Sequence, residues 1–167
     1  MPLSMYQASV PVFARTLGVL SKILDKGAAY AEARNIDPSI LVNARLAPDM
    51  FPLSRQVQIA GDLAMRGAAR LAGVDFPNNP DTETTFPELQ ERIGKTVRFI
   101  EGLSPKQIDG SDERPITIQM RDGALSFTGQ DYLLNFVLPN LYFHVTAAYL
   151  ILRHNGVELG KKDFLGA

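Results

Sequence analysis

Two polar residues, Asn140 and His144, lie in the most apolar stretch of the sequence, which runs from Thr128 to Gly156. They are four residues apart, so a helix would place both on one face, in a stripe of otherwise apolar side chains. An imidazole there could bond a ligand, act as a general base or hold a divalent metal. It could equally be a buried neutral histidine, bonded to Asn140 or to a facing helix. Ala147 and Ala148, one turn further along, would leave room for a pocket.

The second histidine, His154, is ten residues further along the same stretch. In a straight helix this separation corresponds to about 15 Å of rise and about 80° around the axis. His144 and His154 therefore cannot share one metal ion. We expect His154, in the last turn, to interact with the free carbonyl groups at the helix end.

Gln58 and Asp62 form a second polar pair at helical spacing. Such a pair is usually solvated, but if it faces the bundle interior, Asp62 is the carboxylate that would bond to His144 and fix its tautomer. Tyr6 adds an aromatic side chain with a polar tip. The candidates for a ligand pocket are thus His144, Asn140, Asp62, Gln58 and Tyr6. Only His144 and Asp62 are considered as metal ligands, and we expect no bound metal or other cofactor.

Four long segments with helical periodicity must position these residues: residues 4–34, 54–72, 85–101 and 128–156. Capping residues at the spacing of a capping box open the first, third and fourth of them: Ser4 with Gln7, Thr85 with Glu88, and Thr128 with Asp131. The second segment has a core stripe of mainly small residues: Val57, Ala60, Ala64, Ala68 and Leu71. Pro139 should bend the last helix next to Asn140.

Shorter elements complete the pattern. A short helix is expected over residues 38–44, a long surface crossing over 74–84, and a β-hairpin over 116–128, where an Asp-Gly turn joins two alternating runs. The fold class is therefore all-α: a four-helix bundle with a long crossing, a short extra helix and a small β-hairpin that leads directly into the last helix. The length of 167 residues suits one domain, residues 1–167.

The composition excludes several classes of function. Seventeen basic residues against eighteen acidic ones, without a block of like charge, give no basic surface for nucleic acid or anionic lipid. The absence of cysteine excludes disulfides, thiolate metal sites and a cysteine nucleophile. No uninterrupted apolar run reaches the roughly 20 residues of a membrane span, and the start lacks the plan of a signal peptide. We expect a soluble, cytoplasmic protein.

Several long motifs, spread over essentially the whole chain, resemble one bacterial and fungal family. They are SMYQASVPVF near the start, NARLAPDMFPLSRQVQIA, FTGQDY, FHVTAAY and LRHNGVE. The family is the domain-of-unknown-function family numbered nineteen-ninety-three, which is similar to the DinB/YfiT-like superfamily. The resemblance implies a DinB-type four-helix bundle, often dimeric. Active members of that superfamily include thiol-dependent transferases and isomerases.

The same resemblance implies a metal site that this sequence does not reproduce. Active members hold a divalent metal with one histidine on the second helix and a His-x-x-x-His pair on the last. His144 matches the first histidine of the pair, but Ala148 stands at the position of the second, and the second helix has no histidine. We therefore expect the three-histidine site to be absent.

Three hypotheses follow. The leading one is a homodimeric DinB-like bundle that binds a small ligand in a pocket near His144, without the three-histidine metal site. The first alternative is a divalent-metal enzyme, transferase-like or hydrolase-like, with an altered ligand set of His144, Asp62 and Gln58. The second alternative is a structural or partner-binding dimer. The sequence names neither a ligand nor a reaction.

Overall fold

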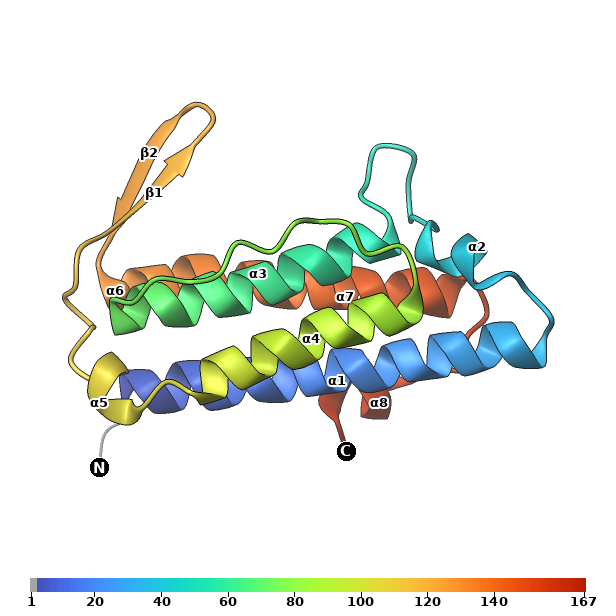
Figure 1. The fold of residues 1–167 in the computed structure, drawn as a ribbon, viewed down its shortest axis with the longest axis horizontal. Helices are drawn as coiled ribbons and strands as arrows, with labels where there is room; N and C mark the ends of the chain where they lie inside the picture. The colour runs from blue at the N-terminus through green and yellow to red at the C-terminus, as the bar shows by residue number, and fades with distance from the viewer. Residues whose placement is uncertain (1–2) are drawn as a thin grey trace.

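The structure, a computed structural model, describes residues 3–167. Its main body is a bundle of four long helices: α1 (Met5–Ala33), α3 (Leu53–Ala72), α4 (Phe86–Glu101) and α7 (Leu138–His154). The long crossing, residues 74–85, returns along α3, so that α3 and α4 run in one direction and α1 and α7 in the other (Figure 1). The predicted helical bundle with one long crossing is thus confirmed.

The remaining elements are short. They are α2 (Pro38–Val42), α5 (Pro105–Ile108), β1 (Ile116–Met120), β2 (Gly123–Phe127), α6 (Gly129–Asp131), the π-helical segment η1 (Tyr132–Val137) and α8 (Lys161–Leu165). The strands β1 and β2 form the predicted antiparallel hairpin, from Ile116 opposite Phe127 to Met120 opposite Gly123. The turn itself is Arg121-Asp122, and Gly123, predicted to lie in the turn, begins the second strand. The hairpin projects from one end of the bundle, immediately before the last helix (Figure 1).

Local sequence explains where most helices begin. Ser4 and Thr85 make the predicted capping boxes with Gln7 and Glu88, and the Thr128 hydroxyl accepts a bond from the Asp131 N–H. The helix α3 differs from the prediction, because it starts at Leu53 with Pro52 as N-cap and has no side-chain cap. Proline fits this position because the first N–H groups of a helix have no partner within the helix.

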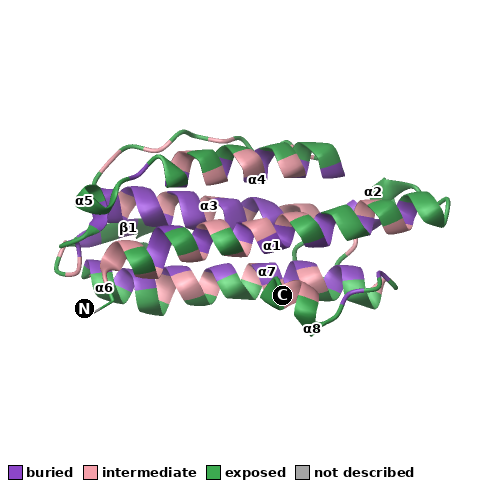
Figure 2. Ribbon diagram, turned by 90° about the horizontal axis from the view of Figure 1, so that it is seen from below, coloured by how far each residue is buried: buried purple, intermediate pink, exposed green. Residues whose placement is uncertain are grey.

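The buried faces of the four long helices turn toward one another (Figure 2). The predicted core stripe of α3 is fully buried: Val57, Ala60, Ala64, Ala68 and Leu71. Small residues on this stripe let α3 and the last helix approach closely, and a Cβ atom on Gly67 would lie 2.8 Å from Val137 Cγ1. The position of η1 and α7 against α3 is therefore set by side-chain size.

The last helix adapts to Pro139 in a way that the sequence did not predict. Instead of a simple bend at Pro139, the segment just before it is π-helical, and the Leu138 N–H donates to the Leu133 carbonyl five residues back. Proline has no N–H, and its ring clashes with the carbonyl four residues before it, so a wider turn at this point relieves the crowding. Such π segments are often found at functional sites.

The continuous helix Gly129–His154 is the one stretch within residues 3–167 that is long and apolar enough to cross a membrane by length and composition. Here it lies within the bundle, packed along α3 and α1. Leu133, Val137, Leu141 and Val145 are among its fully buried residues. The helix is accordingly a structural part of the bundle core.

Candidate functional site

His144 is paired with a residue of the facing helix α3. Its Nδ1 lies 2.7 Å from the Oε1 atom of Gln56, and Gln56 is almost completely buried, at 1% exposure. The His144 ring is partly buried and meets the Phe143 ring edge to face, with the ring centroids 5.2 Å apart. The imidazole is thus held between the two helices that pack most extensively on each other.

The orientation of Gln56 determines which nitrogen of His144 carries the proton. The Gln56 side-chain nitrogen donates to the Phe51 carbonyl at 3.1 Å, which directs Oε1 toward His144. Since an amide oxygen only accepts hydrogen bonds, Nδ1 of His144 must be the protonated nitrogen. Nε2 then carries a lone pair. It has no hydrogen-bond partner among residues 3–167 and is not fully enclosed by protein atoms.

The surroundings of His144 favour this neutral form. Burial lowers the pKa of His144 from its ordinary value of 6.5, and the nearby positive charge of Arg55 lowers it further. Both effects act in the same direction, because a cationic imidazole is poorly solvated there and is repelled by the guanidinium. At neutral pH His144 can therefore accept a hydrogen bond or a proton through Nε2.

The hypothesis of a shared site required Asp62 and Gln58 to face His144. They do not. They are bound to a group of charged side chains that we call the Arg92 network: Arg55, Arg66, Arg92, Asp62, Asp81 and Glu83. Asp62 pairs with Arg92 at 2.7 Å and with Arg66 at 3.0 Å. The Gln58 amide nitrogen donates to Glu83 at 3.1 Å. The predicted grouping of His144 with Asp62 and Gln58 is therefore wrong.

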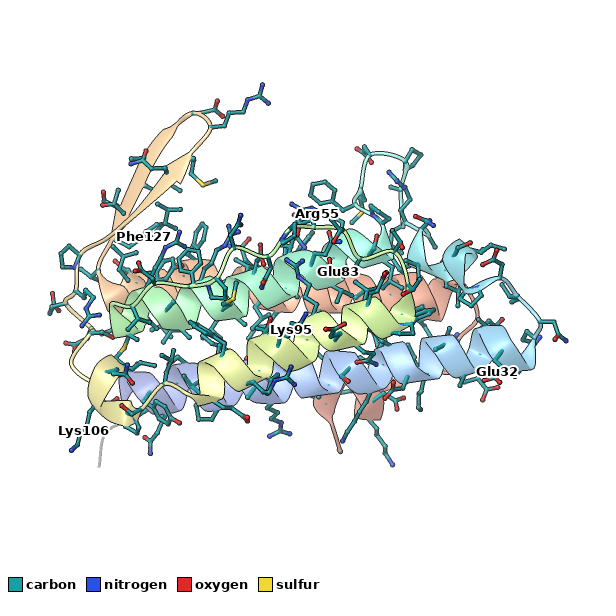
Figure 3. The ribbon with its side chains drawn as sticks, viewed as in Figure 1. Glu32, Arg55, Glu83, Lys95, Lys106 and Phe127 are labelled. Atoms are coloured by element: carbon teal, nitrogen blue, oxygen red, sulfur yellow. The ribbon has the colours of Figure 1, made fainter. Side chains whose placement is uncertain are left out.

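Helix geometry explains the error. With about 100° per residue, Gln58 and Asp62 lie about 160° and about 120° from Gln56 around the α3 axis. They point to the side of α3 that faces the crossing and α4, where Figure 3 places Arg55 and Glu83 close together. A sequence signal for Gln56 did exist, because Gln56 is four residues before Ala60 and extends the buried stripe by one turn.

The Arg92 network fastens the crossing to the bundle. Arg92, with 3% exposure, donates to Asp62, Asp81, Glu83 and the Pro80 carbonyl. Burial by itself would lower the pKa of Arg92, but the hydrogen bond to Glu83 and the attraction to Asp62 outweigh it and raise that pKa. A buried arginine in α4, which the sequence reading did not identify, thus fixes residues 80–83 over α3.

The other two pocket candidates, Asn140 and Tyr6, make no hydrogen bond to His144. Asn140 uses its side-chain nitrogen to donate to the Phe136 carbonyl one turn back, at 2.6 Å. Tyr6 lies in the first turn of α1, where its backbone N–H donates to Asp109, just after α5. His154 lies in the last turn of α7, as predicted, and its side chain is exposed. The predicted interaction with the free carbonyl groups at the helix end stays a prediction. Of the candidates, His144 and Asp62 have side-chain partners on a facing helix, Gln56 of α3 and Arg92 of α4 respectively.

The residues around His144 do not fit a divalent metal. Within residues 3–167, no three histidine, cysteine, aspartate or glutamate side chains come together as a possible metal site. His144 and its neighbour Gln56 would supply one imidazole nitrogen and one neutral amide oxygen, whereas metal sites of this type need three or four protein ligands. Asp62 cannot supply a third ligand without leaving Arg92 and Arg66.

A groove runs along another face of α3, and neither His144 nor Gln56 is among its lining residues. It is lined by one face of α3 from Arg55 to Arg70, by residues 118–120 of β1, and by Tyr132 and Phe136 of η1, and we call it the α3–η1 groove. Its volume is about 370 Å³, which is in the range of small-molecule sites. Arg55 connects it to His144, because it lines the groove, directly precedes Gln56 and acts on the imidazole by its charge.

The α3–η1 groove differs from a second groove of about 420 Å³ between α1, α7 and α8. In the second groove, Arg15 donates to the Leu165 carbonyl and Thr16 to the Val12 carbonyl. The α3–η1 groove has more charged residues in its lining, namely Arg55, Asp62, Arg66 and Arg70. Apolar walls with a few polar groups are typical of ligand sites.

Comparisons with known proteins agree on the fold. The family model described as "Domain of unknown function (DUF1993)" matches residues 5–165. A crystal structure of a DinB family member from Shewanella denitrificans is 44% identical to this chain, with a TM-score of 0.89; the match covers 97% of this chain and 92% of the other. The search of curated proteins returned no match. The resemblance and the DinB-like fold expected from the sequence are confirmed.

Proposed function

This chain belongs to the family of domains of unknown function called DUF1993, and we propose that it binds a small organic molecule in the α3–η1 groove, beside His144. The family description and the similar DinB structure name neither ligand nor reaction. The proposal is therefore supported by the groove itself and by the state of His144.

The observation that carries the proposal is the make-up of the groove. Apolar side chains such as Ile59, Leu63 and Phe136 form its walls, while arginines and the Tyr132 hydroxyl supply polar groups. Two of its lining residues, Tyr132 and Phe136, come from the π-helical segment, whose wider turn changes where side chains point. Apolar walls with a few convergent polar groups are the usual form of a small-molecule site.

His144 does not line the groove, but Arg55, which does, directly precedes its partner Gln56 and acts on the imidazole by its charge. The Nδ1–H of His144 is fixed by Gln56, so Nε2 offers a lone pair to a donor group of the ligand. We propose that Nε2 accepts a hydrogen bond only from a ligand long enough to extend to the Arg55 end of the groove.

The test uses a substitution that fills the groove. Leu63→Trp should abolish the thermal stabilisation that ligands from a small-molecule library give to the wild-type protein. Ile40→Trp, at an isoleucine of α2 with 59% exposure, is the control outside the groove and should keep this stabilisation. Two results would contradict the proposal: no library compound stabilises the wild-type protein, or the stabilisation is unchanged in Leu63→Trp.

The divalent-metal enzyme is the second candidate function, and elemental analysis decides it. Protein purified without a nickel column and incubated with zinc or nickel should hold much less than one metal per chain. About one equivalent of metal that is lost in His144→Ala would establish the metal hypothesis instead. The donor set described above supports the first result.

We also propose that the protein is a cytoplasmic homodimer that uses the outer face of the last helix. Large apolar residues are exposed there: Leu134, Tyr142, Phe143 and Leu150, at 42–57% exposure. Exposed apolar side chains that gather on one helix are typical of interaction surfaces.

Light scattering should give twice the 18.4 kDa chain mass for the wild-type protein, and the mass of one chain for Phe143→Glu. A monomer at micromolar concentration would contradict the proposal, and a dimer without any ligand would favour a structural role.

A further inference from the structure

The charges around the α3–η1 groove cancel, except at Arg70. The Arg92 network contains three arginines and three carboxylates that are all joined by ion pairs. It is therefore neutral as a unit, and its members Arg55 and Arg66 bring no net positive charge to the groove. Arg70 lines the same groove near the hairpin but makes no ion pair with a carboxylate in the part of the chain that the structure describes.

Arg70 is held in place by aromatic residues. Its guanidinium donates to the Tyr132 hydroxyl at 2.9 Å and lies 5.8 Å from the centre of the Tyr132 ring and 5.7 Å from that of Phe76. A guanidinium has five N–H donors in a planar fork. One of them is used by Tyr132, so donors remain for a carboxylate, which is the acceptor that matches the fork best.

The end of α3 does not explain Arg70. A cation in the last turn of a helix interacts well with the free carbonyl groups there, and Arg70 is in that turn. However, Arg114 already donates to the Leu71 carbonyl at 2.8 Å. The Arg70 side chain turns instead to Tyr132 and Phe76.

The rest of the groove fits an apolar group attached to the anion. Next to Arg70 and Tyr132 the lining includes Leu63, Phe136 and Met120, and Met120 has 51% exposure in the hairpin. An anion without an apolar body, such as phosphate, would leave these walls in contact with water. An apolar group in their place would gain the free energy of its transfer from water.

We infer that the ligand is an organic monoanion, most simply a carboxylate, whose charged group pairs with Arg70 and whose apolar body lies against Leu63, Phe136 and Met120. This inference rests on the proposed function and adds the chemical class of the ligand. A single unbalanced positive charge calls for a single negative charge, and a dianion would leave one charge without a partner.

Hexanoate and its neutral analogue hexanamide are the probes, because they have the same shape and differ in charge. In amide NMR titrations of the wild-type protein at pH 7.5, hexanoate should bind at least about tenfold more tightly than hexanamide, the size of effect expected for a charge-assisted hydrogen bond. In Arg70→Gln the two affinities should become equal. Arg34→Gln is the matched control, since Arg34 stacks on Tyr30 at 5.3 Å, outside the groove.

The two proposals fail in different ways. Equal binding of hexanoate and hexanamide to the wild-type groove would overturn the monoanion inference and leave the small-molecule site standing. Absence of any shift in groove residues with either probe would overturn both. The comparison of probes uses the wild-type chain alone, so it stays decisive if Arg70→Gln does not fold. A selectivity that persists in a folded Arg70→Gln protein would also overturn the role of Arg70.

Discussion

His144 and Gln56 form a contact between α7 and α3 that sets which nitrogen of the imidazole is protonated. A buried amide oxygen accepts a hydrogen bond from Nδ1–H, and Nε2 is left unprotonated. If the oxygen were replaced by a carboxylate, the same bond would favour the charged imidazole. The neutral side chain of Gln56 and the nearby charge of Arg55 therefore both favour the neutral form of His144.

We predict that stability falls between pH 7.5 and pH 5.5 because of His144. Its pKa is lowered in the folded state from 6.5, so the unfolded chain binds the extra proton more readily. This contribution is complete above about pH 6.5 and is lost as the pH falls toward the folded-state pKa. Urea unfolding at the two pH values measures it.

In His144→Gln this pH dependence should decrease, whereas His154→Gln, which removes an exposed histidine, should keep it. An unchanged dependence in His144→Gln would contradict the lowered pKa. The range from pH 7.5 to 5.5 is chosen because it lies above the region in which carboxylates with lowered pKa values, such as Glu88, take up protons.

Gln56→Glu should raise the pKa of His144. A carboxylate within hydrogen-bond distance of Nδ1 stabilises the imidazolium, opposing the effects of burial and of Arg55. NMR titration of the His144 ring proton would show a midpoint above that of the wild-type protein. A midpoint that stays the same or decreases would mean that Gln56 does not contact the imidazole in solution.

Between elements, the contact of α3 with η1 depends on a glycine. A Cβ atom on Gly67 would come within 2.8 Å of Val137 Cγ1, which is closer than packed carbon atoms can approach. Gly67→Ala should therefore destabilise the protein by about 1–3 kcal/mol, despite the better helix propensity of alanine. Unfolding in urea gives this free energy directly.

Two variants make the packing explanation specific. Gly18→Ala in α1 has open space around the new atom and should stabilise by up to about 1 kcal/mol through helix propensity alone. Val137→Ala combined with Gly67→Ala should restore part of the loss, because it removes the methyl groups in conflict. If the double variant shows no recovery, the close approach of α3 and η1 is not what limits position 67.

The crossing between α3 and α4 is held mainly by the buried Arg92. Arg92→Leu leaves three carboxylates without their shared partner, so the free energy of unfolding should fall by about 3–5 kcal/mol. Amide exchange should rise first in residues 80–83. Lys95→Met removes only an exposed pair with Glu91 on the same helix and should cost less than about 1 kcal/mol. Equal losses in both variants would contradict the anchoring role.

For the molecule as a whole, local signals in the sequence predicted much of the fold. Capping boxes, the hairpin and the small-residue stripe of α3 depend on neighbours within a few residues, and the structure contains the stripe, the hairpin and two of the three predicted capping boxes, while Thr128 caps without a reciprocal bond from Asp131. The π-helical η1 was missed, because the consequence of Pro139 depends on how tightly the last helix packs against α3. The effect of Pro139 thus depends on contacts with another helix, which the local sequence does not show.

The site was only partly predictable for the same reason. The position of His144 on a buried face follows from periodicity. Its partner Gln56 is 88 residues away in the chain and depends on how α7 is aligned along α3. Gln58 and Asp62 looked like the better partners, since a carboxylate is the usual companion of a functional histidine. Asp62 instead forms an ion pair with the buried Arg92. A single arginine within an apolar helix pattern does not indicate that it will be buried and pair with a carboxylate on another helix.

The central claim, that a small organic molecule binds in the α3–η1 groove beside His144, is tested most directly by mapping ligand-induced shifts on an assigned amide NMR spectrum. With a set of small organic acids and their amides, we predict shifts that cluster in residues 59–70, 118–120 and 132–136 and disappear in Leu63→Trp. Shifts confined to the groove between α1, α7 and α8, or none at all, would contradict the account.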